Sequence, residues 1–305
     1  MVADQQVAIV TGASSGFGRL ITYALAADGY RVVGAFRGSH GGFDSQAEHL
    51  VDGFTAGGPE HLAGSVEPLR MDVSDAASVS RGIQDIHHRT GRIDVLVNAA
   101  GYGLLGPMEC TPIAETTRLY QTNVFGTMML CQAIAPLMRA RGGGTIVNMG
   151  SDVGVRPNLF QSSYAATKFA VDGFSQVLRL ELAPFGIKVA LVVPGWYATE
   201  FGNSVVSTFT TSPYAEIYAE LAAAWEIGVA AVEGPNPDPH EVMESVMAAV
   251  RSKAQHYRYI VGWNSDRIGD IDEAEVEHYQ NRLRAYYRLD DLRFAPAAAE
   301  TGARR

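Results

Sequence analysis

Residues 7–18 read VAIVTGASSGFG. The first five letters form a short apolar run rich in β-branched residues, which predicts a buried strand over Val7–Thr11. The glycine-rich turn leads into residues 16–28, where apolar side chains recur at helical spacing until Gly29. A second apolar strand is expected over Arg31–Phe36. A strand, a glycine turn, a helix and a strand in this order make a βαβ unit, which requires a parallel sheet.

The alternation of strands and helices continues along the chain. Further strands are predicted over residues 66–71, 94–98, 145–149, 187–193 and 257–261. Further helices are predicted over residues 75–90, 113–140, 162–183 and 240–252. Strands separated by helices in this way indicate an α/β fold. We expect a doubly wound, Rossmann-type sheet of seven mostly parallel strands, with helices on both faces, in a single domain.

Three stretches depart from this alternation. Residues 39–64 are rich in glycine and histidine, and we expect them to loop out before the third strand. Residues 201–239 contain an apolar helical piece at 215–232 and are expected to cover the substrate site as an insertion. The dinucleotide-binding and catalytic domain then spans residues 1–267, and residues 268–305 form a C-terminal extension whose end is expected to be flexible.

The composition limits the partners of the protein. Of its 305 residues 47% are hydrophobic and 19% are charged, which supports a sizeable core. A net charge of −9 argues against binding to nucleic acid or to anionic membranes. The sequence shows no signal region and no apolar run long enough to span a bilayer, so a cytoplasmic location is expected. Cys110 and Cys131 are expected to be buried free thiols, and the histidines lack the spacing of a metal site.

The glycine-rich turn is suited to the diphosphate of a dinucleotide. A strand end followed by a helix start presents backbone amides and the positive end of the helix, and side chains would obstruct a phosphate there. The alternative is that the glycines serve only a tight turn. The strand before the turn and the helix after it are the context that the dinucleotide motif requires. The predicted contacts are Gly12, Ser14, Ser15, Gly16, Phe17 and Gly18.

Residues 164–168 read YAATK, which places a lysine one helical turn after a tyrosine. A phenol titrates near about 10, and a neighbouring cation stabilises the phenolate and lowers that pKa. Lys168 shares a helix face with Tyr164, so its ammonium group can approach the phenol. Together with an oxidised nicotinamide, it would bring the pKa of Tyr164 towards neutrality, where general acid–base catalysis is efficient. The alternative is a buried structural tyrosine beside a lysine that extends to solvent.

The order of these motifs resembles the short-chain dehydrogenase/reductase family, in its branch of simple oxidoreductases. Residues 11–18 resemble the TGxxxGxG turn of the family, and residues 98–101, NAAG, resemble its NAG segment. Residues 194–199, PGWYAT, resemble its PGxxxT segment. The catalytic tetrad of the family falls on Asn123, Ser151, Tyr164 and Lys168.

The resemblance implies a role for each of these four residues. Tyr164 would be the acid–base, and Lys168 would tune it and bind the nicotinamide ribose. Ser151, at the carboxyl end of a strand, would hold the substrate oxygen and share its developing charge. The backbone carbonyl of Asn123 would anchor a water molecule in a proton relay. The alternatives are a turn residue at Ser151 and a polar residue that bends its helix at Asn123.

The end of the second strand, Ala35-Phe36-Arg37, predicts a preference for NADP(H). A carboxylate there would bind the ribose hydroxyls and repel a 2′-phosphate. This chain has none at that place, and Arg37 can pair with a phosphate, with Ser39 as a further donor. NAD(H) is the alternative, in which Arg37 only stacks on the adenine.

The resemblance assigns further cofactor contacts. Asp72, followed by Val73, would bind the adenine amino group, with a helix cap as the alternative. Thr199, after Pro194 and Gly195, would bind the nicotinamide carboxamide, with an N-cap as the alternative. Small residues after the fourth strand would admit the ribose, or would only let the sheet pack: Asn98, Ala99, Ala100 and Gly101.

Apolar and aromatic residues near these motifs predict a pocket for a medium-sized, fairly hydrophobic substrate, although core or surface positions are their alternative. The candidates are Tyr102, Leu104, Asp152, Val153, Val155, Phe160, Gln161, Trp196, Tyr197 and Phe201. We predict an NADP-preferring oxidoreductase that interconverts a ketone or aldehyde and an alcohol. The resemblance implies a homodimer or homotetramer. The alternatives are an NAD-linked alcohol dehydrogenase and a non-catalytic cofactor-sensing protein of the same fold.

Overall fold

The computed structural model describes residues 5–38, 42–56, 63–155, 157, 159–209, 237–252, 256–262 and 281. Its main sheet has seven strands in the order β3-β2-β1-β4-β6-β7-β9, and every neighbouring pair is parallel. The strands are β1 (Val7–Thr11), β2 (Arg31–Phe36), β3 (Ser65–Arg70), β4 (Val95–Asn98), β6 (Gly144–Met149), β7 (Ile187–Pro194) and β9 (Arg258–Val261). The predicted doubly wound sheet is therefore confirmed.

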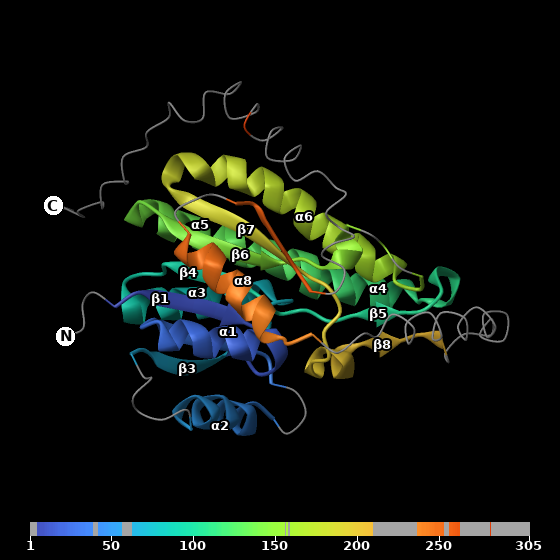
Figure 1. The fold of residues 1–305 in the computed structure, drawn as a ribbon, viewed down its shortest axis with the longest axis horizontal. Coiled ribbons are helices and arrows are strands. Elements are labelled where there is room, and N and C mark those ends of the chain that lie inside the picture. The colour runs from blue at the N-terminus through green and yellow to red at the C-terminus, as the bar shows by residue number, and fades with distance from the viewer. Residues whose placement is uncertain are drawn as a thin grey trace.

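Helices cover both faces of this sheet. They are α1 (Gly16–Ala27), α2 (Gly42–Thr55), α3 (Ala76–Thr90), α4 (Ile113–Tyr120), α5 (Thr127–Arg141), α6 (Ser162–Leu182) and α8 (His240–Arg251). Side chains alternate along β1: Val7 and Ile9 pack with α3 and α5, whereas Ala8 and Val10 pack with α1 and α8. Figure 1 shows α1 and α8 together on the near face. All of β1 is buried, as expected for a strand covered on both sides.

The sequence order of the strands reverses between β1 and β4. The chain runs from β1 outward through β2 and β3, and then crosses to β4 on the other side of β1. In open sheets of this kind, ligands bind beyond the carboxyl ends of the strands at such a switch point. In Figure 1 this edge lies at the right, towards β5 (Leu104–Leu105) and β8 (Val206–Ser207), which form a separate parallel pair.

Two predicted segments differ from the structure. Residues 42–55 form α2, where a loop was expected; Phe43, Ala47 and Leu50 lie on the helix face that packs against Phe36. This i, i+4, i+7 spacing is a helical signal that the glycines and histidines around it obscure. The predicted helix over 113–140 is interrupted by a π-helical turn, η3 (Gln121–Gly126), between α4 and α5. Short 3₁₀ turns complete the chain: η2 (Met108–Cys110), η4 (Asp152–Gly154), η5 (Ala183–Phe185) and η6 (Glu200–Ser204).

Other expectations fall on residues beyond those described. The helical piece at 215–232 lies outside the described residues, and of the extension at 268–305 only residue 281 is described.

Cys110 and Cys131 are buried free thiols, as predicted. Among the residues that the structure places, none of the helices is long and apolar enough to cross a bilayer.

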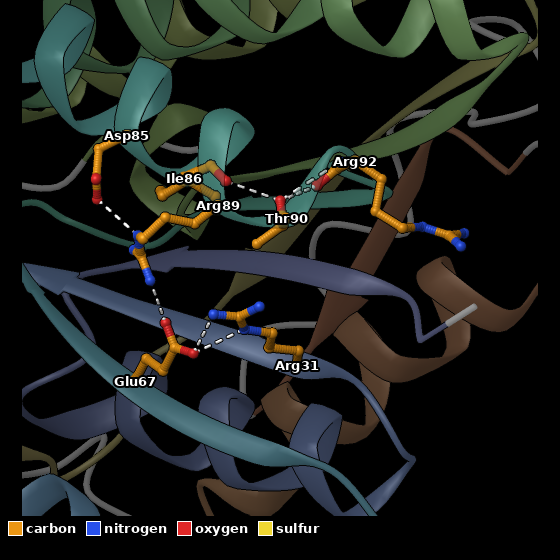
Figure 2. A network of polar contacts seen from close by, with 7 residues as sticks. All are labelled: Arg31, Glu67, Asp85, Ile86, Arg89, Thr90 and Arg92. Atoms are coloured by element: carbon orange, nitrogen blue, oxygen red, sulfur yellow. Dashed lines mark hydrogen bonds and ion pairs between the residues drawn. The ribbon is translucent and has the colours of Figure 1, made fainter. Parts of the chain in front are cut away.

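A network of charged side chains ties the end of α3 to the outer strands, as Figure 2 shows. Glu67 on β3 accepts hydrogen bonds from Arg31 Nε on β2 and from Arg89 Nη1 on α3, both at 2.7 Å. Arg89 Nε also donates to Asp85 at 2.9 Å. The hydroxyl of Thr90 closes the helix end by donating to the carbonyl of Ile86 at 2.8 Å. Glu67 is the member of the network that joins two strands and a helix.

Glu67→Ala will lower the free energy of unfolding by about 1–2 kcal/mol, because it removes the partner of two cations in one network. Asp85→Ala is the matched control; it removes one solvent-exposed pair within a helix and should cost about 0.3–0.5 kcal/mol. Urea denaturation followed by circular dichroism measures both. Equal losses of unfolding free energy in the two variants would show that Glu67 contributes no more to stability than one exposed ion pair.

Candidate active site

The predicted functional residues converge on the carboxyl edge of the sheet. Because the strands are parallel, the segments that follow them emerge on the same side. Those segments are the glycine turn after β1, Arg37 after β2, Asp72 after β3, residues 98–101 after β4, Ser151 after β6, and Gly195 to Thr199 after β7. Residues far apart in the sequence are therefore neighbours here.

The glycine turn brings two backbone segments into close contact. A Cβ atom on Gly18 would lie 2.2 Å from the carbonyl oxygen of Gly12, and Gly12 itself has a positive φ of 69°. The hydroxyl oxygen of Thr11 accepts hydrogen bonds from the amides of Ala99 and Ala100, at 3.1 Å each, and so joins the turn to the end of β4. Side chains would fill this cradle at the start of α1, so its shape fits the diphosphate of a dinucleotide.

Tyr164 lies in the first turn of α6 and is buried in an apolar cluster. Burial raises the pKa of its phenol far above the ordinary value of 10, while a hydrogen bond with the Ser151 side chain opposes that rise. The nearby carboxylate of Asp152 raises it further. The structure therefore brings Ser151 and Tyr164 together, as the sequence predicts.

Lys168 is also buried, and burial lowers its pKa to about 8. Its ammonium nitrogen lies 5.7 Å from the centre of the Tyr164 ring and donates to the carbonyl of Met149, at the end of β6, at 2.9 Å. In the structure, desolvation is the largest influence on the pKa of Tyr164. The lowering expected from Lys168 together with an oxidised nicotinamide stays a prediction.

A close approach of η4 to α6 explains how Ser151 reaches Tyr164. A Cβ atom on Gly154 would lie 2.8 Å from Cβ of Lys168, so this turn packs directly on the helix. Ser151 precedes the turn as its N-cap, and its hydroxyl donates to the carboxylate of Asp152 at 3.0 Å. The glycine thus positions the serine hydroxyl beside the tyrosine.

Asn123 lies in the π-helical turn η3 and is buried. Its side-chain oxygen accepts from the amide of Tyr102 at 3.1 Å, and its side-chain nitrogen donates to the carbonyl of Tyr102 at 3.0 Å and to the hydroxyl of Thr167 at 3.3 Å. It therefore connects the segment after β4 to α6. The backbone carbonyl of Asn123, expected to hold a water molecule, accepts from the hydroxyl of Thr127 at 2.9 Å. π-Helical turns of this kind occur often at functional sites.

The predicted nucleotide contacts occupy the rest of the edge. Asp72 accepts from the amide and hydroxyl of Ser74, at 2.9 and 2.6 Å, and the N-cap of α3 is Asp75 instead. Arg37 is exposed. Thr199 accepts from the amide of Phe201 as an N-cap. Val73 packs beside η3, and the amide of Gly195 donates to the carbonyl of Val261. Ser39 lies outside the described residues.

The candidate substrate residues divide into two groups. One group, which we call the apolar wall, packs around Tyr164 and consists of Tyr102, Leu104, Val153 and Phe201. The ring of Phe201 lies 6.1 Å from that of Tyr164, centre to centre. Asp152 adjoins Ser151, and Gln161 is the N-cap of α6, with a buried side-chain oxygen for which the described residues provide no hydrogen-bond partner.

The other candidates lie away from Tyr164 or form the frame around it. Tyr197 is buried in the core beneath α1 and α8, where its hydroxyl donates to Glu241 at 2.9 Å. Trp196 is half exposed, and Val155 packs in a separate cluster. Phe160 is buried with a positive φ of 62°, a strained conformation for a non-glycine residue, and its carbonyl accepts from the amide of Gly106 at 2.8 Å.

One contact of the glycine turn is not predictable from the sequence. Glu200 Oε2 accepts from the amide of Gly16 at 3.1 Å, and Glu200 Oε1 pairs with Arg19 at 2.5 Å. No spacing rule connects residues that are 181 and 184 positions apart, so the sequence carried no signal for this contact. Among the described residues, no group of three or more histidines, cysteines and carboxylates is arranged to hold a metal ion.

The fold and this edge together define a dinucleotide-binding α/β protein with a serine beside a buried tyrosine. The family model for short chain dehydrogenases matches residues 6–209. The chain belongs to the short-chain dehydrogenase/reductase family. The predicted family and its enzyme class, NAD(P)-dependent oxidoreductases acting on CH–OH groups, are thus confirmed.

Two curated relatives show the breadth of this similarity. A 3-ketodihydrosphingosine reductase of Bacteroides thetaiotaomicron is 37% identical over 65% of this chain and 66% of its own length. Human retinol dehydrogenase 8 is 33% identical over 70% of this chain and 66% of its own length. The chain spans about two thirds of the length of both relatives.

Two solved structures have the same fold. A short-chain dehydrogenase from Streptomyces avermitilis superposes with a TM-score of 0.73 at 30% identity, covering 95% of this chain and 99% of that one. An actinorhodin polyketide ketoreductase variant with NADPH has a TM-score of 0.71 at 27% identity, covering 87% of this chain and 98% of that one.

Proposed function

We propose that the protein is an NADP(H)-preferring oxidoreductase that interconverts a ketone or aldehyde and the corresponding alcohol of a medium-sized, hydrophobic substrate. The observation that carries this proposal is the contact between Ser151 and Tyr164. Ser151 follows β6 at the carboxyl edge of the sheet, and Tyr164 is buried within the apolar wall. A hydroxyl and a phenol that meet in a buried, apolar place can bind and protonate a carbonyl oxygen.

Different residues at the carboxyl edge of the sheet would bind different parts of the cofactor. The amides of the glycine turn would hold the diphosphate, Arg37 would hold the 2′-phosphate, Asp72 the adenine and Lys168 the nicotinamide ribose. The nicotinamide, when bound, supplies or accepts the hydride at the substrate carbon. The amides of Ala99 and Ala100 donate to the hydroxyl of Thr11 and so hold this segment beside the turn.

Tyr164 and Ser151 would act on the substrate oxygen. The raised pKa keeps the phenol protonated at neutral pH, so in reduction it gives a proton from its hydroxyl to that oxygen. The hydroxyl of Ser151 donates to the same oxygen and stabilises its negative charge. In oxidation the phenolate form of Tyr164 takes the proton from the alcohol, and the ammonium group of Lys168 stabilises that phenolate. Asn123 would hold α6 in place through Thr167.

The apolar wall supports a hydrophobic substrate. Leu104 and Val153 are buried against Tyr164, and the rings of Tyr102 and Phe201 pack on the same cluster. Apolar side chains of this kind favour ligands whose surface is mostly carbon. Two of the relatives are named for hydrophobic molecules, 3-ketodihydrosphingosine and retinol, whereas a third is named for the polar alcohol D-threitol.

The test is a fluorescence titration with NADPH and NADH, followed by oxidation of the preferred cofactor in the presence of hydrophobic ketones and aldehydes. Tighter binding of NADPH together with turnover of such a carbonyl supports the proposal. Tighter binding of NADH would favour the NAD-linked alcohol dehydrogenase, and binding without turnover of any carbonyl or alcohol would favour a cofactor sensor. Binding of neither cofactor would refute all three.

We also propose that the chain forms a homodimer or homotetramer through the outer surfaces of α4, η3, α5 and α6. Large apolar side chains are exposed there: Ile113, Phe125, Met128, Phe169 and Val177. Large apolar side chains exposed on neighbouring helices are candidates for burial in a protein interface. Sedimentation equilibrium should give two or four times the mass of 32.8 kDa, and Phe125→Glu combined with Phe169→Glu should give the single-chain mass. A single-chain mass for the unaltered protein would contradict the proposal.

A further inference from the structure

The carboxylate of Glu200 occupies the part of the glycine turn where a phosphate would bind. Its carboxylate accepts the amide hydrogen of Gly16, the first residue of α1, at 3.1 Å, and pairs with Arg19 one turn further along at 2.5 Å. The first amides of a helix have no partner within the helix, and together they attract an anion. The carboxylate therefore already satisfies a group that the cofactor diphosphate needs.

A diphosphate and this carboxylate cannot share the turn without cost. Two anions at the distance of a few ångströms repel each other, and both compete for the same amide and the same guanidinium group. The side chains of Arg19 and Glu200 are 37% and 44% exposed, so water can replace either partner when the pair separates. The contact is thus one that an incoming anion can displace.

The segment that begins with Glu200 reaches the proposed catalytic tyrosine. Phe201 follows at once, and its ring packs on that of Tyr164. The far end of the segment is fixed, because the amide of Val206 donates to the carbonyl of Gly103 at 2.9 Å and β8 pairs with β5. Release of Glu200 would remove one of the attachments of the residues next to Tyr164, while the strand beyond them stays attached.

We propose that Glu200 is a latch that the cofactor displaces. In the cofactor-free protein its carboxylate binds Gly16 and Arg19 and keeps Phe201 over Tyr164. When the dinucleotide binds, its diphosphate takes both contacts, and the segment over Tyr164 is released for the substrate. Cofactor binding then precedes substrate binding. This inference rests on the proposed function, because it requires a dinucleotide at the glycine turn.

Glu200→Gln tests the latch, because it removes the charge and retains the shape. Its dissociation constant for NADPH, measured by fluorescence at low ionic strength, should be about fivefold lower than that of the wild type. The difference should shrink as salt screens the charges. Asp28→Asn is the matched control: it makes the same charge change at the other end of α1, in the exposed pair with Arg251, and should leave the constant unchanged.

A probe without a diphosphate locates the effect. Adenosine 2′-monophosphate should bind the wild type and Glu200→Gln equally, because it does not reach Gly16.

Hydrogen exchange measures whether the segment after Glu200 is released. The amides that report it are those of Gly202 and Val205, which donate to the carbonyls of Thr199 and Gly202. NADPH should speed their exchange in the wild type, and Glu200→Gln should show the faster exchange without cofactor.

The outcomes separate the latch from the proposed function. If the wild type binds NADPH but Glu200→Gln binds it with equal or lower affinity, the latch is refuted and the proposed function stands. Unchanged exchange at Gly202 and Val205 in the variant also refutes the latch. If the wild type binds no dinucleotide at all, the proposed function fails, and the latch fails with it.

Discussion

Replacing Tyr164 with phenylalanine will lower kcat by about a thousandfold and leave the affinity for NADPH within about twofold of the wild type. The phenol is buried beside Ser151, in the place where a substrate oxygen would be protonated. Phenylalanine keeps the ring that packs on Phe201 and removes only the hydroxyl. The loss should therefore appear in the proton-transfer step and spare both the fold and the cradle for the diphosphate.

The measurement is single-turnover oxidation of NADPH at saturating substrate, with the affinity determined by fluorescence. Tyr23→Phe is the matched control, because Tyr23 lies on α1, stacks on Phe54 and has no part in the site. It should retain the wild-type kcat. Near-normal turnover by Tyr164→Phe would show that another group, or water, supplies the proton, and would refute the proposed role of the phenol.

The sheet was predictable from the sequence because each strand is a short apolar run that both faces bury. The predicted Val7–Thr11 and Arg31–Phe36 have the observed bounds, and the ends of the other strands differ by at most one residue. The glycine turn was predictable for a related reason: backbone contacts as close as that of Gly18 with Gly12 admit no side chain. Short sequence patterns are enough to predict features of this kind, because they depend only on neighbouring residues.

What the sequence did not predict depends on contacts between distant segments. The π-helical turn at Asn123 is stabilised by bonds to Tyr102 and Thr167, and nothing in its own helix marks it. Tyr197 has the aromatic character of a pocket residue, yet its hydroxyl bond to Glu241 holds it in the opposite core. No local pattern marks the pairing of Glu200 with Gly16 either.

Replacing Arg37 with aspartate will reverse the cofactor preference: NADPH will bind about a hundredfold more weakly, and NADH will bind more tightly than in the wild type. Arg37 follows β2 directly and is exposed at the carboxyl edge. A carboxylate there repels a 2′-phosphate and accepts hydrogen bonds from the ribose hydroxyls of NADH.

Titrations with both cofactors measure this reversal, and Arg70→Asp is its matched control. Arg70 ends β3 beside Phe36, with its guanidinium group over the ring of Phe43, so this variant makes the same charge change one strand away. If the overall electrostatic field at the carboxyl edge of the sheet selects NADPH, both variants will lower the affinity for NADPH to the same extent. If a direct pair with the 2′-phosphate selects it, only Arg37→Asp will reverse the preference. An unchanged preference in Arg37→Asp would instead leave Arg37 as a side chain that stacks on the adenine without discriminating between the cofactors.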